Sequence, residues 1–377
     1  MSLLNRFLEG LRVLDVSAYI PGPLASLVLA DMGADVIKIE PPAGDGMREL
    51  GPRNDADTPL FHAAINAGKR ICRLDLKSEA GREIFLQLAD QADVLIEGFR
   101  PGVMDRLGLG YEALAARNPA LVYCALSGFG ATSPDAAAAG HDLNYLATAG
   151  ILDRNGMPPR PFDPPITDVS GSLFAAIALL GALRRRDQDG TGCFIDIALA
   201  DTPMLLQQFA VAAWGALQTV PRTDTTYLNG GAAYYRTYAT RDGHHIALAA
   251  VEPKFWRAFC TAAGHEAWIG RHQEPLPQRA LIADLDNYFA SLTLSECNAR
   301  FTAADCCYSP VLDLGEALCS PHHLSRGLLR RGPDAALQTL FPAWVDGSAP
   351  ATRRPAQNDP HPAFELRPVS TKGDASN

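Results

Sequence analysis

The sequence predicts an α/β fold in which a Rossmann-like, parallel-sheet large domain is followed by a smaller α+β domain. Short apolar strands alternate with helical segments to about residue 200, as they do in a parallel sheet with crossover helices. At 377 residues the chain is also long for one domain, so two are expected. A polar stretch at 221–226 separates the alternating part from a second block, which begins near Tyr227.

The first strand–helix–strand unit sets the architecture of the large domain. It consists of a strand at 11–16, a turn at Pro21-Gly22-Pro23, a helix at 24–32 that ends at Gly33, and a strand at 35–40. Such a unit implies parallel pairing through a right-handed crossover. Glu40 ends the second strand, where dinucleotide-binding folds carry an acidic residue. Their glycine fingerprint is missing, so a hydride-transfer cofactor is not expected.

The alternation of strands and helices continues through the rest of the large domain, and a hairpin followed by helices is predicted after it. The further elements are a basic strand at 69–77, a helix at 79–91 capped by Ser78, strands at 94–97 and 121–126, an apolar helix at 173–186, a strand at 194–199 and a second apolar helix at 201–219. After the linker come strands at 234–239 and 245–250 with a hairpin-type turn at 241–244, and helices at 253–263 and 278–291. We therefore predict a large domain at 1–200, a linker helix at 201–226 and a small domain at 227–329.

Composition excludes several classes of protein. The net charge of −9 argues against general nucleic-acid binding. No apolar run appears long enough to span a bilayer, and the N-terminus has no signal-peptide core, so a cytoplasmic protein without a membrane partner is expected. The eight cysteines are scattered without a Cys-x-x-Cys motif, which indicates reduced thiols rather than disulfides or zinc. No ligand spacing indicates a catalytic metal, and no Gly-x-Ser-x-Gly elbow is present.

His141 and Asp168 are the residues most suggestive of chemistry, because each stands at the start of a predicted helix. Asp168 precedes small residues and a long apolar run, which places its carboxylate near a helix N-terminus. The free N–H groups there could stabilise an anion formed on a substrate. A helix-capping aspartate and an ordinary histidine are the alternative, which spacing alone favours.

The segment Gly140-His141-Asp142-Leu143-Asn144-Tyr145 resembles the GHD(I/L)NY segment of α-methylacyl-CoA racemases, in the family III CoA-transferase superfamily. Further segments resemble this family in the same order, over about the first 330 residues: 11–15, 21–23, 31–40, 92–102, 229–235 and 251–255. The resemblance implies the family III CoA-transferase fold, an interlocked homodimer, and a large domain completed by 330–377. The chain lacks the Gly-Glu-His-Thr-type motif near the end of many members, and its last residues, Pro-, Ala- and Arg-rich from about 332, look disordered.

The resemblance also implies a reaction and its residues. A racemase removes a proton beside a thioester from one face and returns one to the other through an enolate, which takes two bases. His141 and Asp168 match these bases, and Glu252 matches the glutamate that orients the histidine, supplied by the other chain. For Glu252 the alternative is a helix-start acid before Pro253. Asp142 either serves the site or caps a helix.

The substrate implied is an acyl-CoA, with coenzyme A as part of the substrate and no cofactor required. Its phosphates need basic residues, and Arg100 is the best choice because it follows a strand end and carries a planar fork. Candidates in the same binding role are Lys69, Arg70, Arg73 and Glu40. Lys77 is interpreted as a solvated surface base. Steroid side chains, branched fatty acids and small diacids all fit as the acyl group.

Two other functions compete with racemisation. A family III CoA-transferase would use Asp168 alone, as a nucleophile that forms an acyl intermediate. His141 favours the racemase, since a transferase needs no second base there. The sequence Asp168-Val169-Ser170-Gly171-Ser172 departs from the Asp-Phe-(Ala/Gly)-Gly-Gly common in racemases, which leaves room for another acyl group or for transfer. A non-catalytic CoA-binding protein is the third possibility.

Overall fold

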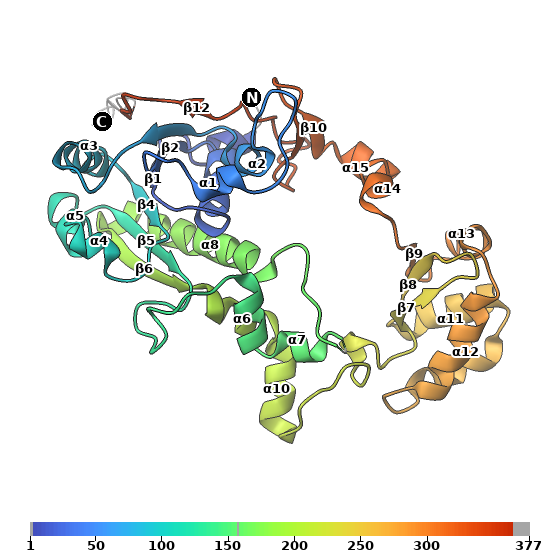
Figure 1. The fold of residues 1–377 in the computed structure, drawn as a ribbon. Helices are drawn as coiled ribbons and strands as arrows, with labels where there is room; N and C mark the ends of the chain where they lie inside the picture. The colour runs from blue at the N-terminus through green and yellow to red at the C-terminus, as the bar shows by residue number, and fades with distance from the viewer. Residues whose placement is uncertain (1–2, 157, 365–377) are drawn as a thin grey trace, which may run out of the picture. The chain divides into compact units, whose positions relative to one another are not determined.

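A computed structural model describes residues 3–156 and 158–364 of the chain (Figure 1). By its contacts the chain forms two compact units. Unit 1 comprises residues 1–146, 162–205 and 321–377, and unit 2 comprises residues 147–161 and 206–320. The domain limits expected from the sequence, at 200, 226 and 329, stay a prediction. The predicted disorder of the last residues concerns 365–377, which lie outside the described residues.

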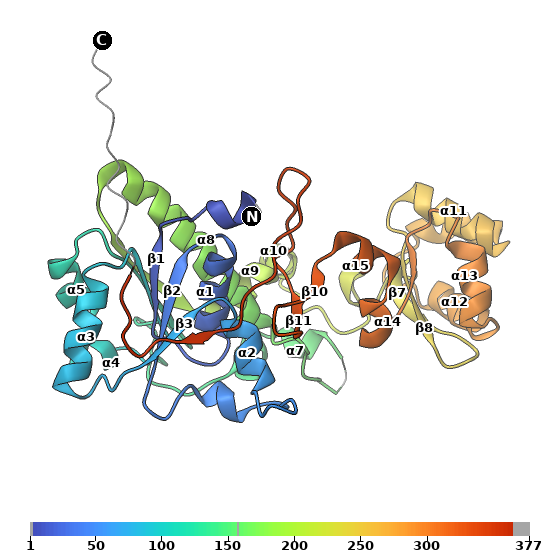
Figure 2. The ribbon, with the colours of Figure 1, turned by 90° about the horizontal axis from the view of Figure 1, so that it is seen from above.

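Unit 1 is built on a parallel sheet with helices on both faces (Figures 1 and 2). Its strands are β1 (Arg12–Asp15), β2 (Asp35–Glu40), β3 (Arg70–Arg73), β4 (Val94–Glu97), β5 (Val122–Ser127), β6 (Cys193–Ala198) and β12 (Gln357–Asn358), with a separate pair β10 (Leu329–Arg331) and β11 (Leu337–Thr339). Its helices are α1 (Pro21–Asp31), α2 (Leu60–Asn66), α3 (Glu79–Ala89), α4 (Val103–Arg106), α5 (Tyr111–Arg117), α6 (Asp142–Thr148), α8 (Ile166–Asp189), α9 (Thr202–Leu206) and α15 (Pro321–Arg326).

The strand order of the sheet is β12-β3-β2-β1-β4-β5-β6, and every pair is parallel. The order reverses between β1 and β4, and open α/β sheets bind ligands at such a switch point, beyond the carboxyl ends of the strands. Buried residues of α3, α4 and α5 pack on one face, and those of α1 and α8 pack on the other. The predicted α/β class with a Rossmann-like parallel sheet is confirmed.

Helix α8 is longer than the predicted 173–186 and begins at Ile166. The small residues before the apolar run belong to the helix because they allow close packing: a Cβ on Gly171 would lie 2.3 Å from a Leu199 methyl carbon. In the described part of the chain, α8 has the length and apolar composition of a membrane-crossing helix, so the expectation that no run is long enough is wrong. Leu179 and Leu183 of α8 pack in the core of unit 1, which accounts for the apolar composition.

The second apolar helix, predicted at 201–219, is interrupted. It divides into a 3-10 turn at Leu199–Asp201, α9 and α10 (Gln208–Leu217), with Gln207 in a non-helical conformation between the helices. The Gln207 side chain donates to Ala149 O (2.8 Å) and accepts from Arg154 (2.6 Å). These bonds hold the chain where the helix breaks, because the side chain joins α10 to α7 (Ile151–Arg154).

The C-terminal segment completes the sheet of unit 1 at its β3 edge (Figure 2). β12 pairs with β3, and the Arg353 guanidinium forms a bidentate ion pair with Asp31 at 2.5 and 2.6 Å. Phe364 packs into the core beneath α3. The described tail therefore contributes both a strand and core contacts to unit 1.

Unit 2 contains a small antiparallel sheet and a cluster of helices. Its elements are β7 (Tyr235–Ala239), β8 (His245–Ala249), β9 (Tyr308–Pro310), α7, α10, α11 (Pro253–Ala263), α12 (Arg279–Ala290), α13 (Leu294–Phe301) and α14 (Leu314–Leu318). The hairpin between β7 and β8 forms where it was predicted, with Gly243 at φ +81° in its turn. Trp256, Phe259 and Phe289 lie in an aromatic core between the helices and the sheet.

Candidate active site

A cavity of about 350 Å³ lies in unit 1 beyond the carboxyl ends of β1, β4 and β5, at the switch point of the sheet. Its lining includes the segments that follow these strands, at 17–19, 98–101 and 126–128. Arg100, His141 and Asp168 all line it. The structure therefore brings together three of the residues that the sequence singled out, from segments far apart along the chain.

Asp168 occupies the first turn of α8 and is only partly exposed. Burial raises the pKa of its carboxyl to about 6, the nearby Asp142 carboxylate adds to the rise, and His141 opposes it. No ion pair joins Asp168 to a lysine or arginine among the described residues. A carboxyl with this pKa can both remove and return a proton near neutral pH.

Asp142 connects the two helix starts that carry the site. Its Oδ1 accepts from the Thr167 N–H at 2.6 Å, from the Asp168 N–H at 3.3 Å and from the Thr167 hydroxyl. Asp142 therefore caps α8, a helix that starts 24 residues further on, and fixes α6 beside it. The N–H groups of Thr167 and Asp168 are taken, so our expectation that they are free for a substrate anion is wrong.

His141 directly precedes α6, and its backbone N–H donates to Asn144 Oδ1 at 3.0 Å. The imidazole is exposed to the cavity and meets the Tyr19 ring edge-on, with centroids 6.4 Å apart. Below this turn the Tyr145 hydroxyl donates to Gly140 O at 2.7 Å. The segment around His141 thus owes its shape to hydrogen bonds made by Asn144 and Tyr145.

Tyr19 is a site residue that sequence reasoning missed. It lines the cavity with φ +61°, a left-handed conformation that costs energy for a bulky side chain. Its backbone N–H donates to Asp45 Oδ1 at 3.3 Å, and its hydroxyl packs against Gly46. Nothing in the sequence marks a positive φ at a tyrosine, so only the structure reveals it.

Two of the basic residues predicted to bind CoA, Lys69 and Arg70, do not line this cavity. Lys69 is completely buried, and its Nζ donates to Pro23 O (2.7 Å), Asn66 Oδ1 (2.9 Å) and Asp15 Oδ2 (3.3 Å). Arg70 forms ion pairs with Asp35 and Asp359 at the edge of the sheet. These positions correct the prediction for both residues: each base is engaged in the fold, and neither lines a cavity that we describe.

Glu40 ends β2, where it lines a second cavity and is also held by the fold, so its predicted place among the ligand contacts stays a prediction. Burial alone would raise the pKa of its carboxyl, but hydrogen bonds from His62 (2.7 Å) and Arg48 (2.8 and 3.1 Å) outweigh it and lower the pKa to about 2. Arg73 remains exposed, near Gly44. Of the basic cluster on β3, Arg73 is thus the member left accessible to a ligand.

A second cavity, of about 460 Å³, adjoins the first, since Ser17, Ala18 and Phe99 line both. It lies beyond the ends of β2 and β3, and Lys77 and Arg106 line it. Lys77 was interpreted as a surface base, and Arg106 was not considered. Lys77 follows the end of β3 by four positions, a signal that would have found it, whereas Arg106 lies in α4, nine positions after β4, and has no such signal.

Glu252 belongs to unit 2, where it is exposed at the N-cap position of α11. Its side chain accepts no capping hydrogen bond, and Pro253 occupies the first turn of the helix. Glu252 thus occupies the helix-start position before Pro253 that the alternative interpretation gave it, although its carboxylate forms no capping hydrogen bond. Whether Glu252 orients the histidine stays a prediction.

The chain is similar to known proteins both in sequence and in structure. The protein-family model described as "CoA-transferase family III" matches residues 8–362. Human alpha-methylacyl-CoA racemase is 33% identical over 336 residues, which cover 85% of this chain and 81% of the racemase. Acetyl-CoA:oxalate CoA-transferase of Acetobacter aceti is 32% identical over 335 residues, 85% of each chain. The crystal structure of a CAIB/BAIF family protein from Brucella suis superposes with a TM-score of 0.82 at 28% identity, covering 94% of this chain and 96% of that one.

Proposed function

The chain belongs to CoA-transferase family III and is an enzyme of its transferase and racemase group, and within this group we propose that it is an acyl-CoA racemase. It would invert the α-carbon of a 2-methylacyl-CoA by two-base proton transfer. The observation that carries the proposal is the position of His141 and Asp168 on one cavity, with an Asp168 pKa of about 6. A single nucleophilic carboxylate would not need the imidazole.

The proposed steps follow from these two groups. The Asp168 carboxylate takes the α-proton from one face, and the electron pair of the C–H bond delocalises into the thioester carbonyl as an enolate. The His141 imidazolium then returns a proton to the opposite face. For the other enantiomer, neutral His141 takes the proton and the protonated Asp168 carboxyl returns one.

Stabilisation of the enolate would come from the start of α1 rather than from that of α8. Pro21 and Gly22, in the first turn of α1, line the same cavity, so the positive end of this helix dipole would face a thioester bound there. Glycine is required at 22, since a Cβ there would lie 2.1 Å from Ser17 Oγ. The packing of α1 against Ser17 thus sets one wall of the site.

The acyl-CoA would extend over both cavities. We place the thioester in the first cavity and the nucleotide in the second, where Lys77 and Arg106 supply positive charge for phosphate and apolar walls suit an adenine. Arg100 lies on the segment shared by the two, which suits a contact to the pyrophosphate. Coenzyme A is then part of the substrate, and we expect chelators and added NAD to leave the rate unchanged.

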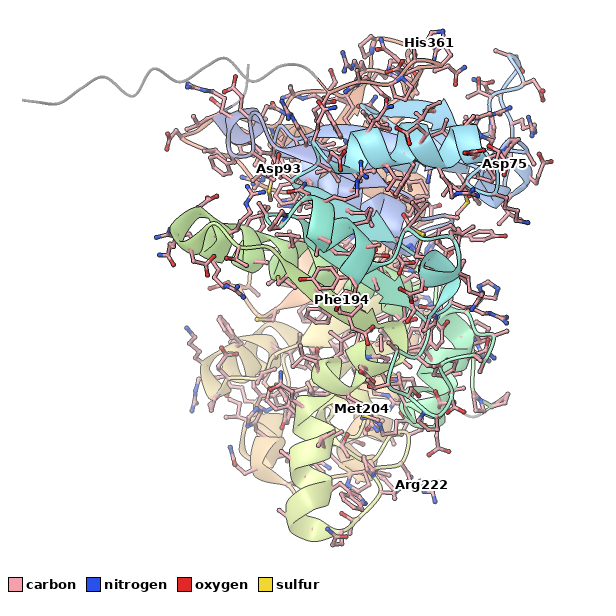
Figure 3. The ribbon with its side chains drawn as sticks, turned by 90° about the vertical axis from the view of Figure 1, so that its left-hand side faces the viewer. Asp75, Asp93, Phe194, Met204, Arg222 and His361 are labelled. Atoms are coloured by element: carbon pink, nitrogen blue, oxygen red, sulfur yellow. The ribbon has the colours of Figure 1, made fainter. Side chains whose placement is uncertain are left out.

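A homodimer is part of the proposal. Helix α10 has no buried residue, and its apolar side chains reach exposures of 81% at Phe209 and 67% at Leu217 (Figure 3, next to Met204). A second copy would cover such a surface, and it would supply Glu252 to orient the imidazole. We also propose a cytoplasmic location, which the eight free thiols favour.

CoA transfer between carboxylic acids is the second candidate. Burial and Asp142 raise the pKa of Asp168, which makes its carboxylate the more basic nucleophile, and a relative of similar identity is named for CoA transfer to oxalate. The carboxylate would attack the thioester carbonyl, release CoA thiolate and carry the acyl group as an anhydride. His141 has no assigned part in that reaction.

Incubation in deuterated water separates the two candidates. A 2-methylacyl-CoA should gain deuterium at the α-carbon without any acceptor acid, as measured by mass spectrometry. Activity that appears only when a second carboxylic acid is added would replace the racemase with the transferase.

A further inference from the structure

A third cavity, of about 240 Å³, lies in unit 1 among β4, β5, β6, α4 and α5, and neither proposed activity uses it. The residues that concern us are carboxylates and aromatic side chains: Glu97, Asp105, Tyr111, Tyr123, Phe194 and Asp196. Figure 3 shows the Phe194 side chain on the face of unit 1 that is turned toward the viewer. The cavity therefore has one acidic and one aromatic part.

Three rings form the aromatic part. Their centroids are 5.9 Å apart for Tyr111 and Tyr123, 5.4 Å for Tyr111 and Phe194, and 5.6 Å for Tyr123 and Phe194. Phe194 keeps 43% of its surface exposed although it belongs to this cluster. An exposed ring face beside negative charge is an environment that attracts cations.

The carboxylates of this cavity lack a counter-charge. Glu97 is 7% exposed, and its only hydrogen bond among the described residues is from the Phe99 N–H, to Oε2 at 2.6 Å. Burial, together with the neighbouring Asp105 and Asp196 carboxylates, raises the pKa of Glu97 to about 7, against the opposing effect of the Phe99 hydrogen bond. No ion pair joins any of the three to a base within residues 3–156 and 158–364. The cavity therefore carries negative charge that the fold does not neutralise.

The Tyr123 hydroxyl is the second, independent sign of a ligand. Tyr123 is 2% exposed and lines the cavity, yet its hydroxyl makes no hydrogen bond to any residue that the structure describes. The hydroxyl is not among the fully buried, unpartnered side-chain atoms of the described residues, so it opens on the cavity, where an occupant with polar hydrogens can reach it.

We propose that the third cavity binds a small primary ammonium ion. Its N–H groups would donate to the free Glu97 oxygen and to the Tyr123 oxygen, and its charge would be balanced by Asp196 and stabilised by the rings. A metal ion fits less well, because the described residues contain no group of three or more His, Cys, Asp or Glu side chains placed to hold one. The site is separate from the proposed thioester cavity, although Phe99, Pro101 and Ser127 line both.

The test is isothermal titration calorimetry of the full chain with n-butylammonium chloride. We expect saturable binding at one site, weaker binding of tetramethylammonium chloride, which has no N–H to donate, and none of sodium chloride at the same ionic strength. Absence of saturable butylammonium binding, or equal binding of all three salts, overturns the proposal.

Matched variants locate the binding. Glu97→Gln keeps the shape but removes the charge, and it should weaken binding at least tenfold. Tyr123→Phe removes one hydrogen bond, which should cost roughly fivefold. Glu83→Gln, at an exposed position of α3, is the control and should bind as the unchanged protein does. Should Glu97→Gln fail to fold, Asp196→Asn at the rim takes its place with the same expectation. Equal affinity of the cavity variants and the control contradicts the proposal.

The pH dependence provides a further check. A cation prefers the ionised Glu97 carboxylate, so the affinity should rise between pH 6 and pH 8, as this group loses its proton near pH 7. The other titratable groups that line the cavity or lie beside Glu97 are Asp105, Tyr111, Glu112, Tyr123, Cys124 and Asp196, and none of them is basic. Glu97→Gln should abolish this dependence, and an unchanged pH profile in that variant contradicts the assignment.

Discussion

Asp15 and Asp168 are two aspartates of unit 1 whose pKa values differ. Burial raises the pKa of both carboxyls, but neighbouring lysines lower the pKa of Asp15, whereas a neighbouring carboxylate raises that of Asp168. Asp15 is completely buried, but Lys38 and Lys69, with the hydroxyls of Ser17 and Ser26, outweigh the effect of burial and lower its pKa to about 2. Asp168 has a carboxylate and only an imidazole nearby, and its pKa rises to about 6. The difference teaches that the available cations, more than the depth, decide whether a buried carboxyl stabilises the fold or exchanges protons.

The two carboxyls also have opposite effects on stability as the pH changes. The pKa of Asp15 is lower in the folded than in the unfolded chain, so its contribution is present above the unfolded pKa and is lost as the pH falls toward 2. The pKa of Asp168 is higher in the folded chain, so its ionisation disfavours folding as the pH rises through 4 to 6. The site therefore keeps its reactive carboxyl at some expense of stability.

The largest expected effect is on catalysis. Asp168→Ala and His141→Ala should each lower racemisation by roughly 10²–10⁴-fold, the usual worth of a positioned acid or base. Each variant should still exchange the α-proton of one pure enantiomer with retention, because the remaining base serves its own face. Deuterium exchange of each enantiomer measures this. Racemisation at the unchanged rate in His141→Ala would reject the two-base mechanism and favour Asp168 as a nucleophile.

Removing a cation from Asp15 should have the next largest effect. Lys69→Ala leaves a buried carboxylate short of one partner, and we expect a loss of about 3–5 kcal/mol in the free energy of unfolding. Lys77→Ala, at an exposed position, is the matched control and should change stability by less than about 0.5 kcal/mol. Urea unfolding at pH 7 compares the two. Equal stabilities would show that Lys38 alone neutralises Asp15.

A smaller effect is expected when a negative charge is removed beside Asp168. The rate of proton removal by Asp168 should fall tenfold per pH unit below about pH 6, where its carboxyl is protonated. Asp142→Asn keeps a capping oxygen but removes the charge that helps to raise this pKa, so the acid limb should move to lower pH. The pH profile of kcat/KM shows the shift. An unmoved limb would mean that burial alone sets the pKa.

The smallest effect concerns substrate binding. Arg100→Ala should raise the KM for acyl-CoA roughly tenfold and leave kcat nearly unchanged, because a phosphate contact stabilises ground and transition states alike. Arg70→Ala is the control, since Arg70 is paired with Asp35 and Asp359. Steady-state kinetics distinguish them. A fall in kcat at constant KM would move Arg100 into the chemistry.

The sequence predicted the parts of the fold that have local signals. The strands at 35–40 and 94–97 appear with the predicted bounds, and α11 begins at Pro253 and ends before Gly264 as its proline and glycine indicate. The position of Asp168 near the N-terminus of α8 is confirmed, but the predicted range of 173–186 was too short because close packing overrides the low helix propensity of Ser170, Gly171 and Ser172.

The site residues that belong to a sequence motif were predicted correctly as lining one cavity. The role of a residue that depends only on tertiary contacts was not predicted. His141 and Asp168 meet on one cavity as the family motif implies. Lys69 was assigned to the ligand because it stands among other bases, but sequence clustering does not reveal that its side chain points inward to Asp15. Its partner lies 54 positions away along the chain, which no local pattern can show.

The pairing of β12 with β3 has a consequence for synthesis on the ribosome. Until residues 353–364 emerge, the outer edge of β3 has no strand beside it, and its N–H and C=O groups are open to any other extended peptide. At usual rates of elongation, the roughly 280 residues between the two strands take about 14–56 s to make. During that interval the nascent sheet can add a foreign strand, so chaperone occupancy of this edge would govern the yield of folded protein.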